Sequence, residues 1–208
     1  RLEADMDHIL TAGQHLLGMI DDVIHLSSAE MGQASLEISS LGLDSLLAPL
    51  AEDAREWARE RGNQFEYRPP QRSIPLHTDG EKLAVILRHL LKNAAKFTDG
   101  GSIIFSVTLL PDPGGTQVVF SVADTGIGID SDQLATIFLP FTQADNSSTR
   151  RYAGTGLGLA ISQHLTALLR GSLSVHSRPG QGSTFTLTVP AMLPAPLERA
   201  VSALSHRS

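Results

Sequence analysis

The sequence predicts an α+β domain in which helices cover a mostly antiparallel sheet, with one further helix added at the N-terminal end. Segments with apolar residues at three- and four-residue steps are interspersed with shorter segments in which apolar and polar residues alternate. Glycine- and proline-rich turns, such as "PDPGG" and "RPGQG", separate neighbouring strand segments. With 208 residues and 41% hydrophobic content, the chain can bury a single core of ordinary size.

The first expected element is a helix over residues 1–31. Its apolar seam recurs at alternating four- and three-residue steps: Leu2, Met6, Ile9, Gly13, Leu16, Ile20 and Val23. Such a seam is typical of a coiled coil or a helical bundle. The helix can pack on its own domain, but a repeat sustained over about three heptads favours a partner helix outside it.

The next expected elements begin after Gly32, which ends the first helix. A short strand is expected over 36–41. Asp44 is a suitable N-cap for a helix over about 45–61, and the alternating "QFEYR" predicts a strand over 64–68.

The remaining elements follow a loop bracketed by prolines. Asp79 is expected to cap a long helix over about 80–97. After it we expect, in order, strands over 102–110 and 116–124, a polar connection over 125–153, a helix over 155–169, and strands over 171–177 and 183–189. The chain thus divides into a helix (1–31), an α+β domain (32–190) and a linker or tail (191–208).

Composition limits the classes of function. The formal charge of −6 and the pI near 5.7 argue against nonspecific binding to nucleic acid or to an anionic membrane. The chain has no cysteine, which excludes disulfides and thiolate chemistry and fits the cytoplasm. No apolar run reaches the ~18 residues that span a bilayer. Because the chain begins with Arg1, we expect it to be a piece of a longer protein.

The helix over 80–97 carries a polar stripe of His89, Asn93 and Lys96. At ~100° per residue this stripe lies about a quarter-turn from the apolar stripe of the same helix. An amide oxygen can bind Mg²⁺ and an ammonium can neutralise phosphate, so the stripe suits a Mg²⁺–polyphosphate group. The alternative is an ordinary solvated helix face.

Two glycine-rich runs follow. In "DTGIGI", Asp124 stands at the end of a strand, where its carboxylate can accept a hydrogen bond from an exocyclic amine. Gly126 and Gly128 allow close backbone approach or positive φ, although glycines after a strand can be simply a turn.

The second run, "GTGLGL", opens a helix whose free N–H groups suit an anion, with Arg150 and Arg151 just before it. It lacks the Gly-Lys-Ser/Thr ending of a Walker motif, and on its own it can be a flexible helix start.

The motifs in this order resemble the catalytic and ATP-binding domain of bacterial sensor histidine kinases, of the hybrid type. "LLKNAAKFT" resembles the N box, "DTGIGI" the first glycine box, "IFLPFTQ" with Phe138 and Phe141 the F box, "STRRYAGTGLGLAIS" the second glycine box and "GQGSTFTLTVP" the third. "AGQHLLGMIDDVIHLSSAEMG" resembles the second helix of the dimerisation and phosphotransfer hairpin. The resemblance implies a two-layer α/β sandwich with a mixed sheet, as in gyrase and Hsp90.

The resemblance also implies roles. Asp124 would read the adenine amine, with the glycines of the first run lining the pocket, and residues 125–153 would form a lid that moves over ATP. Asn93 would hold Mg²⁺. Near the phosphates it places Lys96, Arg150, Arg151, Tyr152, Gly154, Thr155, Gly156, Leu157 and Gly158, and near the adenine Ser183 and Thr184.

The chain departs from the family pattern at His89, where an asparagine is usual, and at Ala153, where a glycine is usual. We expect His89 to line the phosphate end of the pocket, the alternative being that it makes only local hydrogen bonds. ATP-hydrolysing relatives carry a glutamate base at this position, so His89 weakens a hydrolase interpretation. A non-catalytic nucleotide-binding or scaffold module is the other rival.

The phosphoacceptor is expected outside this chain. The family's acceptor histidine precedes an acidic residue and an Arg-Thr-Pro run, and none of His8, His15 or His25 does so. The implied partners are ATP or ADP, a second copy that forms a homodimer through the helical hairpin of the full-length protein, and a response regulator receiver domain. The implied function is transfer of the ATP γ-phosphate to that external histidine.

Overall fold

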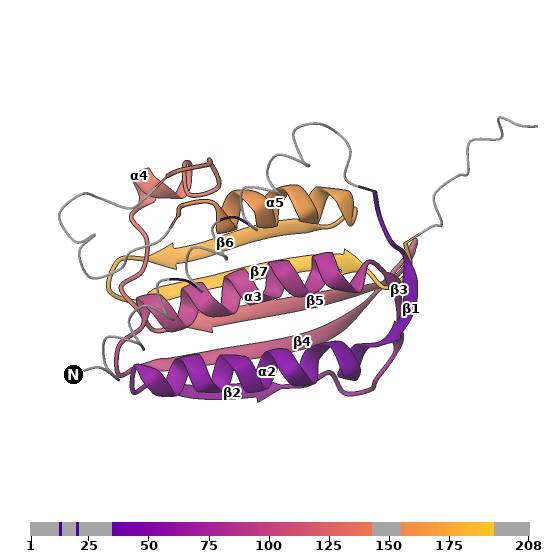
Figure 1. The fold of residues 1–208 in the computed structure, drawn as a ribbon, viewed down its shortest axis with the longest axis horizontal. Coiled ribbons are helices and arrows are strands. Elements are labelled where there is room, and N and C mark those ends of the chain that lie inside the picture. Colours follow the sequence, from indigo (N-terminus) through magenta and orange to yellow (C-terminus); the bar gives the residue numbers. More distant parts are fainter. Residues whose placement is uncertain (1–12, 14–19, 21–34, 143–154, 194–208) are drawn as a thin grey trace, which may run out of the picture.

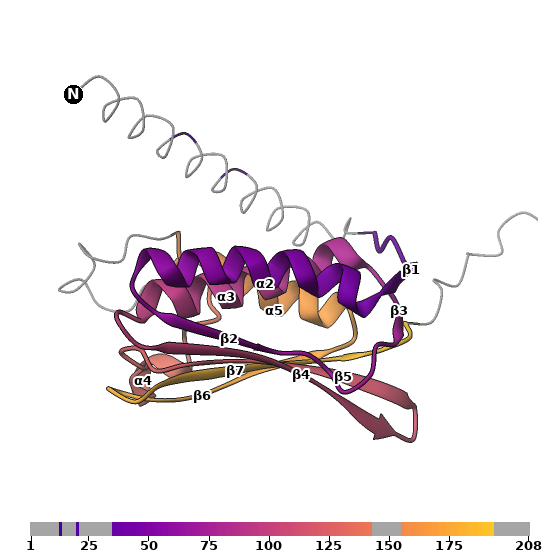
Figure 2. The same cartoon turned by 90° about the horizontal axis from the view of Figure 1, so that it is seen from below.

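The computed structural model describes residues 13, 20, 35–142 and 155–193. Of these, residues 35–142 and 155–193 form a two-layer sandwich (Figure 1). Three long helices, α2 (Leu43–Glu60), α3 (Gly80–Phe97) and α5 (Gly158–Leu168), lie side by side in one layer. Figure 2 shows all three on the same side of the sheet. A short helix, α4 (Ser131–Leu134), lies at the edge near β6.

The main sheet has the strand order β2-β4-β5-β7-β6. Its strands are β2 (Gln64–Arg68), β4 (Ser102–Asp112), β5 (Gly115–Asp124), β6 (Ser172–Arg178) and β7 (Gly182–Pro190). β2 pairs with β4 in parallel, because α3 lies between them in the chain, and every other pair is antiparallel. The α+β sandwich with a mixed sheet is therefore confirmed.

The core lies between the two layers. Every second residue of β4 and β5 faces the helices, so Phe105 and Phe120 are fully buried. α3 lies centrally, contacts both α2 and α5, and buries Leu83, Leu87 and Leu90 completely. The apolar stripe of α3 thus orients the helix and turns its polar stripe toward the edge of the core.

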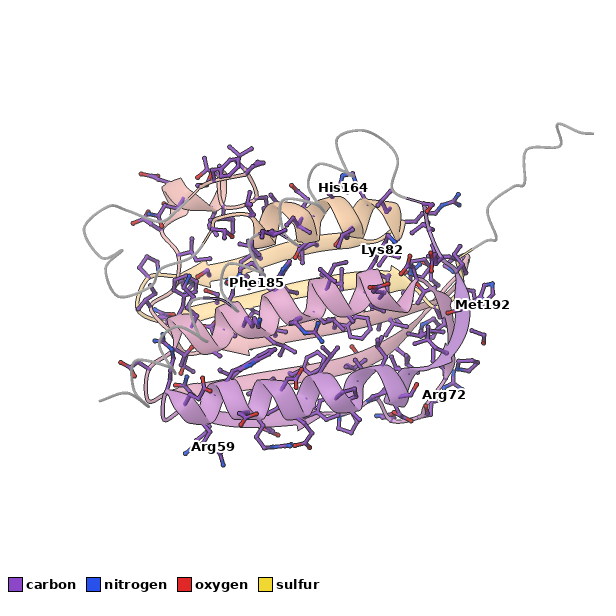
Figure 3. The ribbon with its side chains drawn as sticks, viewed as in Figure 1. Arg59, Arg72, Lys82, His164, Phe185 and Met192 are labelled. Atoms are coloured by element: carbon purple, nitrogen blue, oxygen red, sulfur yellow. The ribbon has the colours of Figure 1, made fainter. Side chains whose placement is uncertain are left out.

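A second, two-stranded sheet closes one end of the sandwich. β1 (Ser39–Gly42) pairs with β3 (Pro75–Thr78), and the chain after β7 adds to it. The His77 amide donates to the Ala191 carbonyl (2.8 Å), and the Leu193 amide donates to the His77 carbonyl (2.7 Å). Ala191 and Leu193 are buried, whereas Met192 projects outward (Figure 3). The packed part of the chain therefore extends to Leu193, into the stretch assigned by sequence to a linker or tail.

Some local predictions were wrong. α2 begins at Leu43 with Gly42 as its N-cap, so Asp44 is not the cap; its charge lies in the first turn, where it favours the helix dipole. β3 was missed, because Pro75 and the neighbouring prolines read as a loop. α5 begins at Gly158 rather than at 155.

The seam of the N-terminal helix lies outside the described residues, apart from Gly13 and Ile20. Within the described part of the chain, no helix is long and apolar enough to cross a membrane.

Candidate nucleotide-binding site

Three stretches meet at the end of the sandwich opposite β1: the end of α3, the loop after β5, and the β6–β7 hairpin. The Ile127 amide donates to the Phe97 carbonyl (3.2 Å), which ties the loop to α3. The Gly180 amide donates to the Ile127 carbonyl (2.7 Å), which ties the hairpin to the same loop. The three stretches therefore hold each other in position without any ligand.

The glycines of the first run permit this close approach. A Cβ on Gly126 would collide with the Phe97 carbonyl. Gly128 has φ +70°, and a Cβ there would collide with the Arg178 carbonyl. Gly126 and Gly128 are thus required by contacts between backbones, which adds a structural reason to the predicted role beside a ligand.

Asp124 lies at the end of β5, partly buried among these stretches. Its Oδ1 accepts hydrogen bonds from the Gly126 amide (2.8 Å) and the Ser183 amide (3.3 Å). Burial raises the pKa of Asp124, while the hydrogen bonds from these two amides and the polarity of the nearby Thr98 hydroxyl partly offset the rise. The Thr98 hydroxyl is buried and makes no hydrogen bond of ordinary geometry within the described residues. Asp124 is therefore a fixed, partly desolvated acceptor, the type of group that binds an amine.

The structure separates the two predicted adenine-side hydroxyls. Ser183 and Phe185 share the face of β7 that lies under the helices, where Figure 3 places Phe185. Ser183 is beside Asp124, whereas Thr184 is on the opposite face and pairs with Ala123 and His176. A cleft of about 290 Å³ lies at this hairpin, lined by Asp124, His176, Ser177, Arg178, Gln181, Gly182, Ser183 and Thr184. Neither Asn93 nor Lys96 lines this cleft, so the predicted phosphate end lies outside it.

The polar stripe on α3 is held by contacts at both ends of the helix. At the start, Asp79 accepts from the Lys82 amide (3.0 Å), which confirms its predicted role as the N-cap. Past the end, the buried Asn63 side chain donates to the Thr98 carbonyl (2.9 Å) and accepts from the Gly101 amide (2.9 Å). The sequence gives no sign of this role for Asn63, because its partners lie more than thirty residues away along the chain.

Asn93 and Lys96 are both partly buried on α3. Burial, and then the positive charge of Arg61, lower the pKa of Lys96. The Lys96 ammonium lies 4.8 Å from the centre of the Phe97 ring, and none of the ion pairs among the described residues includes it. An anion bound beside Lys96 would stabilise its charged form.

His89 contacts the start of α5. Its ring would lie 3.4 Å from a Cβ on Gly158, and its Nδ1 lies 3.2 Å from the Ser162 hydroxyl. Ser162 donates its single proton to the Gly158 carbonyl (2.7 Å), so its oxygen accepts from Nδ1–H of His89. His89 therefore joins α3 to the helix that the second glycine run opens.

The F box and the second glycine run are bonded to each other. The Phe141 amide donates to the Gly156 carbonyl (3.1 Å), and Gly156 has φ +71°. Phe138 packs against the core, whereas Phe141 is 70% exposed and has φ +61°. The Thr155 hydroxyl accepts from the Leu157 amide (3.2 Å), and Leu157 is buried. The predicted phosphate ligands Arg150, Arg151, Tyr152 and Gly154 lie outside the described residues.

A family model agrees with this arrangement. Residues 78–193 match the family described as histidine kinase-, DNA gyrase B- and HSP90-like ATPases. The match begins at β3 and ends at Leu193, so it covers the site and the segment that follows β7.

Individual relatives match a larger part of the chain. The autoinducer 2 sensor kinase/phosphatase LuxQ of Vibrio vulnificus strain YJ016 is 39% identical over 191 residues, 89% of this chain and 22% of LuxQ. The circadian input-output histidine kinase CikA of Synechococcus elongatus is 38% identical over 181 residues, 86% of this chain and 24% of CikA. The chain thus spans about a quarter or less of the length of these relatives.

A solved structure gives the same result. Full-length ShkA, crystallised with AMPPNP, is 33% identical and superposes with a TM-score of 0.73 over 94% of this chain and 40% of ShkA. The fold, the ordered motifs and these matches together show that the chain belongs to the histidine kinase-, DNA gyrase B- and HSP90-like ATPase family, as an ATP-binding catalytic domain of the sensor histidine kinase type.

Proposed function

We propose that the protein containing this chain is a protein-histidine kinase that transfers the ATP γ-phosphate to a histidine outside residues 1–208. The observation that carries the proposal is the partly buried carboxylate of Asp124, held by two backbone amides where α3, the β5 loop and the β6–β7 hairpin meet. A carboxylate so placed can accept a hydrogen bond from the amine of adenine. The relatives are named as a sensor kinase/phosphatase and a histidine kinase, which supports the transfer reaction over a non-catalytic module.

The adenine end of the proposed site consists of Asp124, Ser183 and the glycines Gly126 and Gly128. Thr184 is left out of this end, since it lies on the other face of β7. Gly182, the first residue of β7, has φ +88°, and a Cβ at this position would collide with the Asp124 carbonyl. It therefore lets β7 approach Asp124 closely enough for the Ser183 amide to bond the carboxylate.

The phosphate end would consist of Asn93, Lys96 and the second glycine run. The proposed ligands from that run and the segment before it are Arg150, Arg151, Tyr152, Gly154, Thr155, Gly156, Leu157 and Gly158. No group of three or more His, Cys, Asp or Glu side chains that could hold a metal is present among the described residues. The residues still fit Mg²⁺, because this ion is commonly held by phosphate oxygens and water with only one or two protein oxygens, here the Asn93 amide. The bound ion would neutralise charge on the transferring phosphoryl group.

The protein's own contribution to transfer is position and charge. Phosphoryl transfer needs little covalent chemistry from the protein, so catalysis depends on holding the γ-phosphate in line and neutralising its oxygens. Lys96 suits this role because its charge is poorly compensated before an anion binds. His89 is held to Ser162 through Nδ1, in the place where hydrolysing relatives carry a carboxylate base, and this favours transfer over hydrolysis.

The remaining parts of the proposal concern the whole protein. We propose a homodimer formed through the helical hairpin, a response regulator receiver domain as the downstream partner, and a cytoplasmic location for this domain. The charge of −6 supports neither nucleic acid nor anionic membrane as a partner.

The test of transfer is incubation of the chain with Mg²⁺ and ATP labelled at the γ-phosphate, with and without a longer version that carries the upstream helix. We expect acid-labile, alkali-stable label only when the upstream helix is present. Label on His8, His15 or His25 in the short chain would contradict an external acceptor, and release of labelled phosphate alone in both samples would favour an ATP hydrolase.

A further inference from the structure

Ser177 lies at the centre of the site without having any predicted role. It is on β6, facing the helices, and its hydroxyl oxygen has three polar neighbours. The Ile129 amide donates to it (2.8 Å), and it lies 2.8 Å from the Gly182 carbonyl and 2.9 Å from the Ser183 hydroxyl. Ser177 therefore contacts the loop of the first glycine run and both residues that adjoin Asp124 on β7.

The single proton of the Ser177 hydroxyl fixes the direction of these bonds. A carbonyl oxygen can only accept, so an oxygen–oxygen distance of 2.8 Å to Gly182 requires the Ser177 proton to lie between them. With that proton used, the contact with Ser183 is a hydrogen bond only if Ser183 is the donor. Ser177 then donates once and accepts twice, from the Ile129 amide and the Ser183 hydroxyl, which is its full capacity.

The consequence reaches the ligand through Ser183. Since the Ser183 proton points at Ser177, only the lone pairs of the Ser183 oxygen are available to another partner. The Ser183 amide meanwhile donates to the Asp124 carboxylate (3.3 Å), so this hydroxyl and the carboxylate belong to one small cluster. The cluster therefore presents acceptors, and no hydroxyl donor, to a base that binds beside it.

We propose that Ser177 is a positioning residue for base selection: it locks the Ser183 hydroxyl as an acceptor, and the site thereby favours a purine with a 6-amino group over one with a 6-keto group. An amino group brings two N–H donors to the two acceptors, whereas a keto oxygen would face them as a third acceptor. The inference rests on the proposed adenine site at Asp124.

The experiment compares ADP with IDP, which differ at the purine 6-position and at the N1 proton. Calorimetry with Mg²⁺ gives both dissociation constants for the full chain and for Ser177→Ala, Ser183→Ala and the double variant. Ser174→Ala is the matched control, because Ser174 is an exposed position on the other face of the same strand.

We expect Ser177→Ala to lower the preference for ADP over IDP by about threefold to tenfold, the range for one neutral hydrogen bond. The freed Ser183 hydroxyl can then rotate and donate to the keto oxygen. Ser183→Ala should lower the preference as well, and adding Ser177→Ala to it should change nothing further, because Ser177 acts only through Ser183. Ser174→Ala should keep the wild-type preference.

If Ser177 had a purely structural role, Ser177→Ala would weaken the binding of ADP and of IDP equally. The ratio of their two dissociation constants would then stay unchanged, and this result would overturn the proposal. An unchanged ratio in Ser183→Ala would also overturn it, even if Ser177→Ala failed to fold. Failure of the wild-type chain to bind ADP at all would refute the adenine site itself, and that outcome is distinguishable because it appears before any variant is compared.

Discussion

Asp124 illustrates at the residue scale how a binding group lowers the stability of the fold that holds it. Burial raises its pKa, and the hydrogen bonds from Gly126 and Ser183 offset only part of that effect. A carboxyl with a raised pKa in the folded state stabilises the fold below its unfolded pKa of about 3.9, and this contribution is lost as the pH rises through the folded pKa. Near neutral pH the ionised carboxylate therefore opposes folding.

The first prediction concerns this effect. Without nucleotide, Asp124→Asn should melt at a higher temperature than wild type at a pH of about 7, and the difference should shrink as the pH falls toward about 4. Thermal unfolding at several pH values measures it. Asp112→Asn is the control, since Asp112 is exposed at the other end of the β4–β5 hairpin. A difference that grows on acidification would contradict the direction of the pKa shift.

His89 gives a second prediction at the residue scale. Its Nδ1–H bond to Ser162 joins α3 to α5 through side chains. His89→Ala and Ser162→Ala should each destabilise the domain, and a double-mutant cycle should show a coupling of about 0.5–1.5 kcal/mol, the contribution of one hydrogen bond. Urea unfolding of the four proteins measures it, and additive effects would show that the two side chains do not interact.

At the scale of elements, the loop after β5 depends on the absence of a side chain at Gly128. Both Gly128 and Gly100 have positive φ, at +70° and +63°, but only Gly128 would place a Cβ against another backbone. Gly100→Ala should therefore cost only the left-handed strain, about 1 kcal/mol or a little more. Gly128→Ala should cost clearly more and weaken nucleotide binding as well. Equal costs in chemical denaturation would mean that the loop and the hairpin can separate freely.

The sequence predicted the elements whose signals are local. The apolar stripe of α3 and the cap at Asp79 are adjacent in sequence, and the apolar segments on either side of the turn signal "PDPGG" located β4 and β5. β3 was missed because it forms through pairing with β1 and with the chain after β7, which no local pattern reports.

The candidate site shows the same limit. Asp124, Asn93 and the glycine runs were predicted from motifs, whereas Asn63 and Ser177 were not. Asn63 binds Thr98, and Ser177 binds Ile129, in each case a residue more than thirty positions away along the chain. These contacts form only when the chain folds, so no local sequence pattern reports them. Successive side chains of β7 point to opposite faces of the sheet, so Thr184 points away from the face that holds Ser183. A comparison of motifs does not consider which face a residue occupies.

At the scale of the whole molecule, the described domain begins and ends at the same place. Residues 35–38 lead into β1, and the segment after β7 pairs with β3, so both ends lie beside the two-stranded sheet (Figure 1). The proposed site occupies the other end of the sandwich. α3 runs between the two, since Asp79 at its start also accepts from the Glu37 amide (2.9 Å) and its end meets the loop after β5.

The central claim is that Asp124 reads the nucleotide base at this second end. Titration calorimetry of ADP with Mg²⁺ tests it most directly, with wild type, Asp124→Asn and the control Asp112→Asn. The account predicts that Asp124→Asn binds about ten- to hundredfold more weakly, because a charge-assisted hydrogen bond to the adenine amine is lost, and that Asp112→Asn binds as wild type does. Equal affinity of Asp124→Asn and wild type would contradict the account.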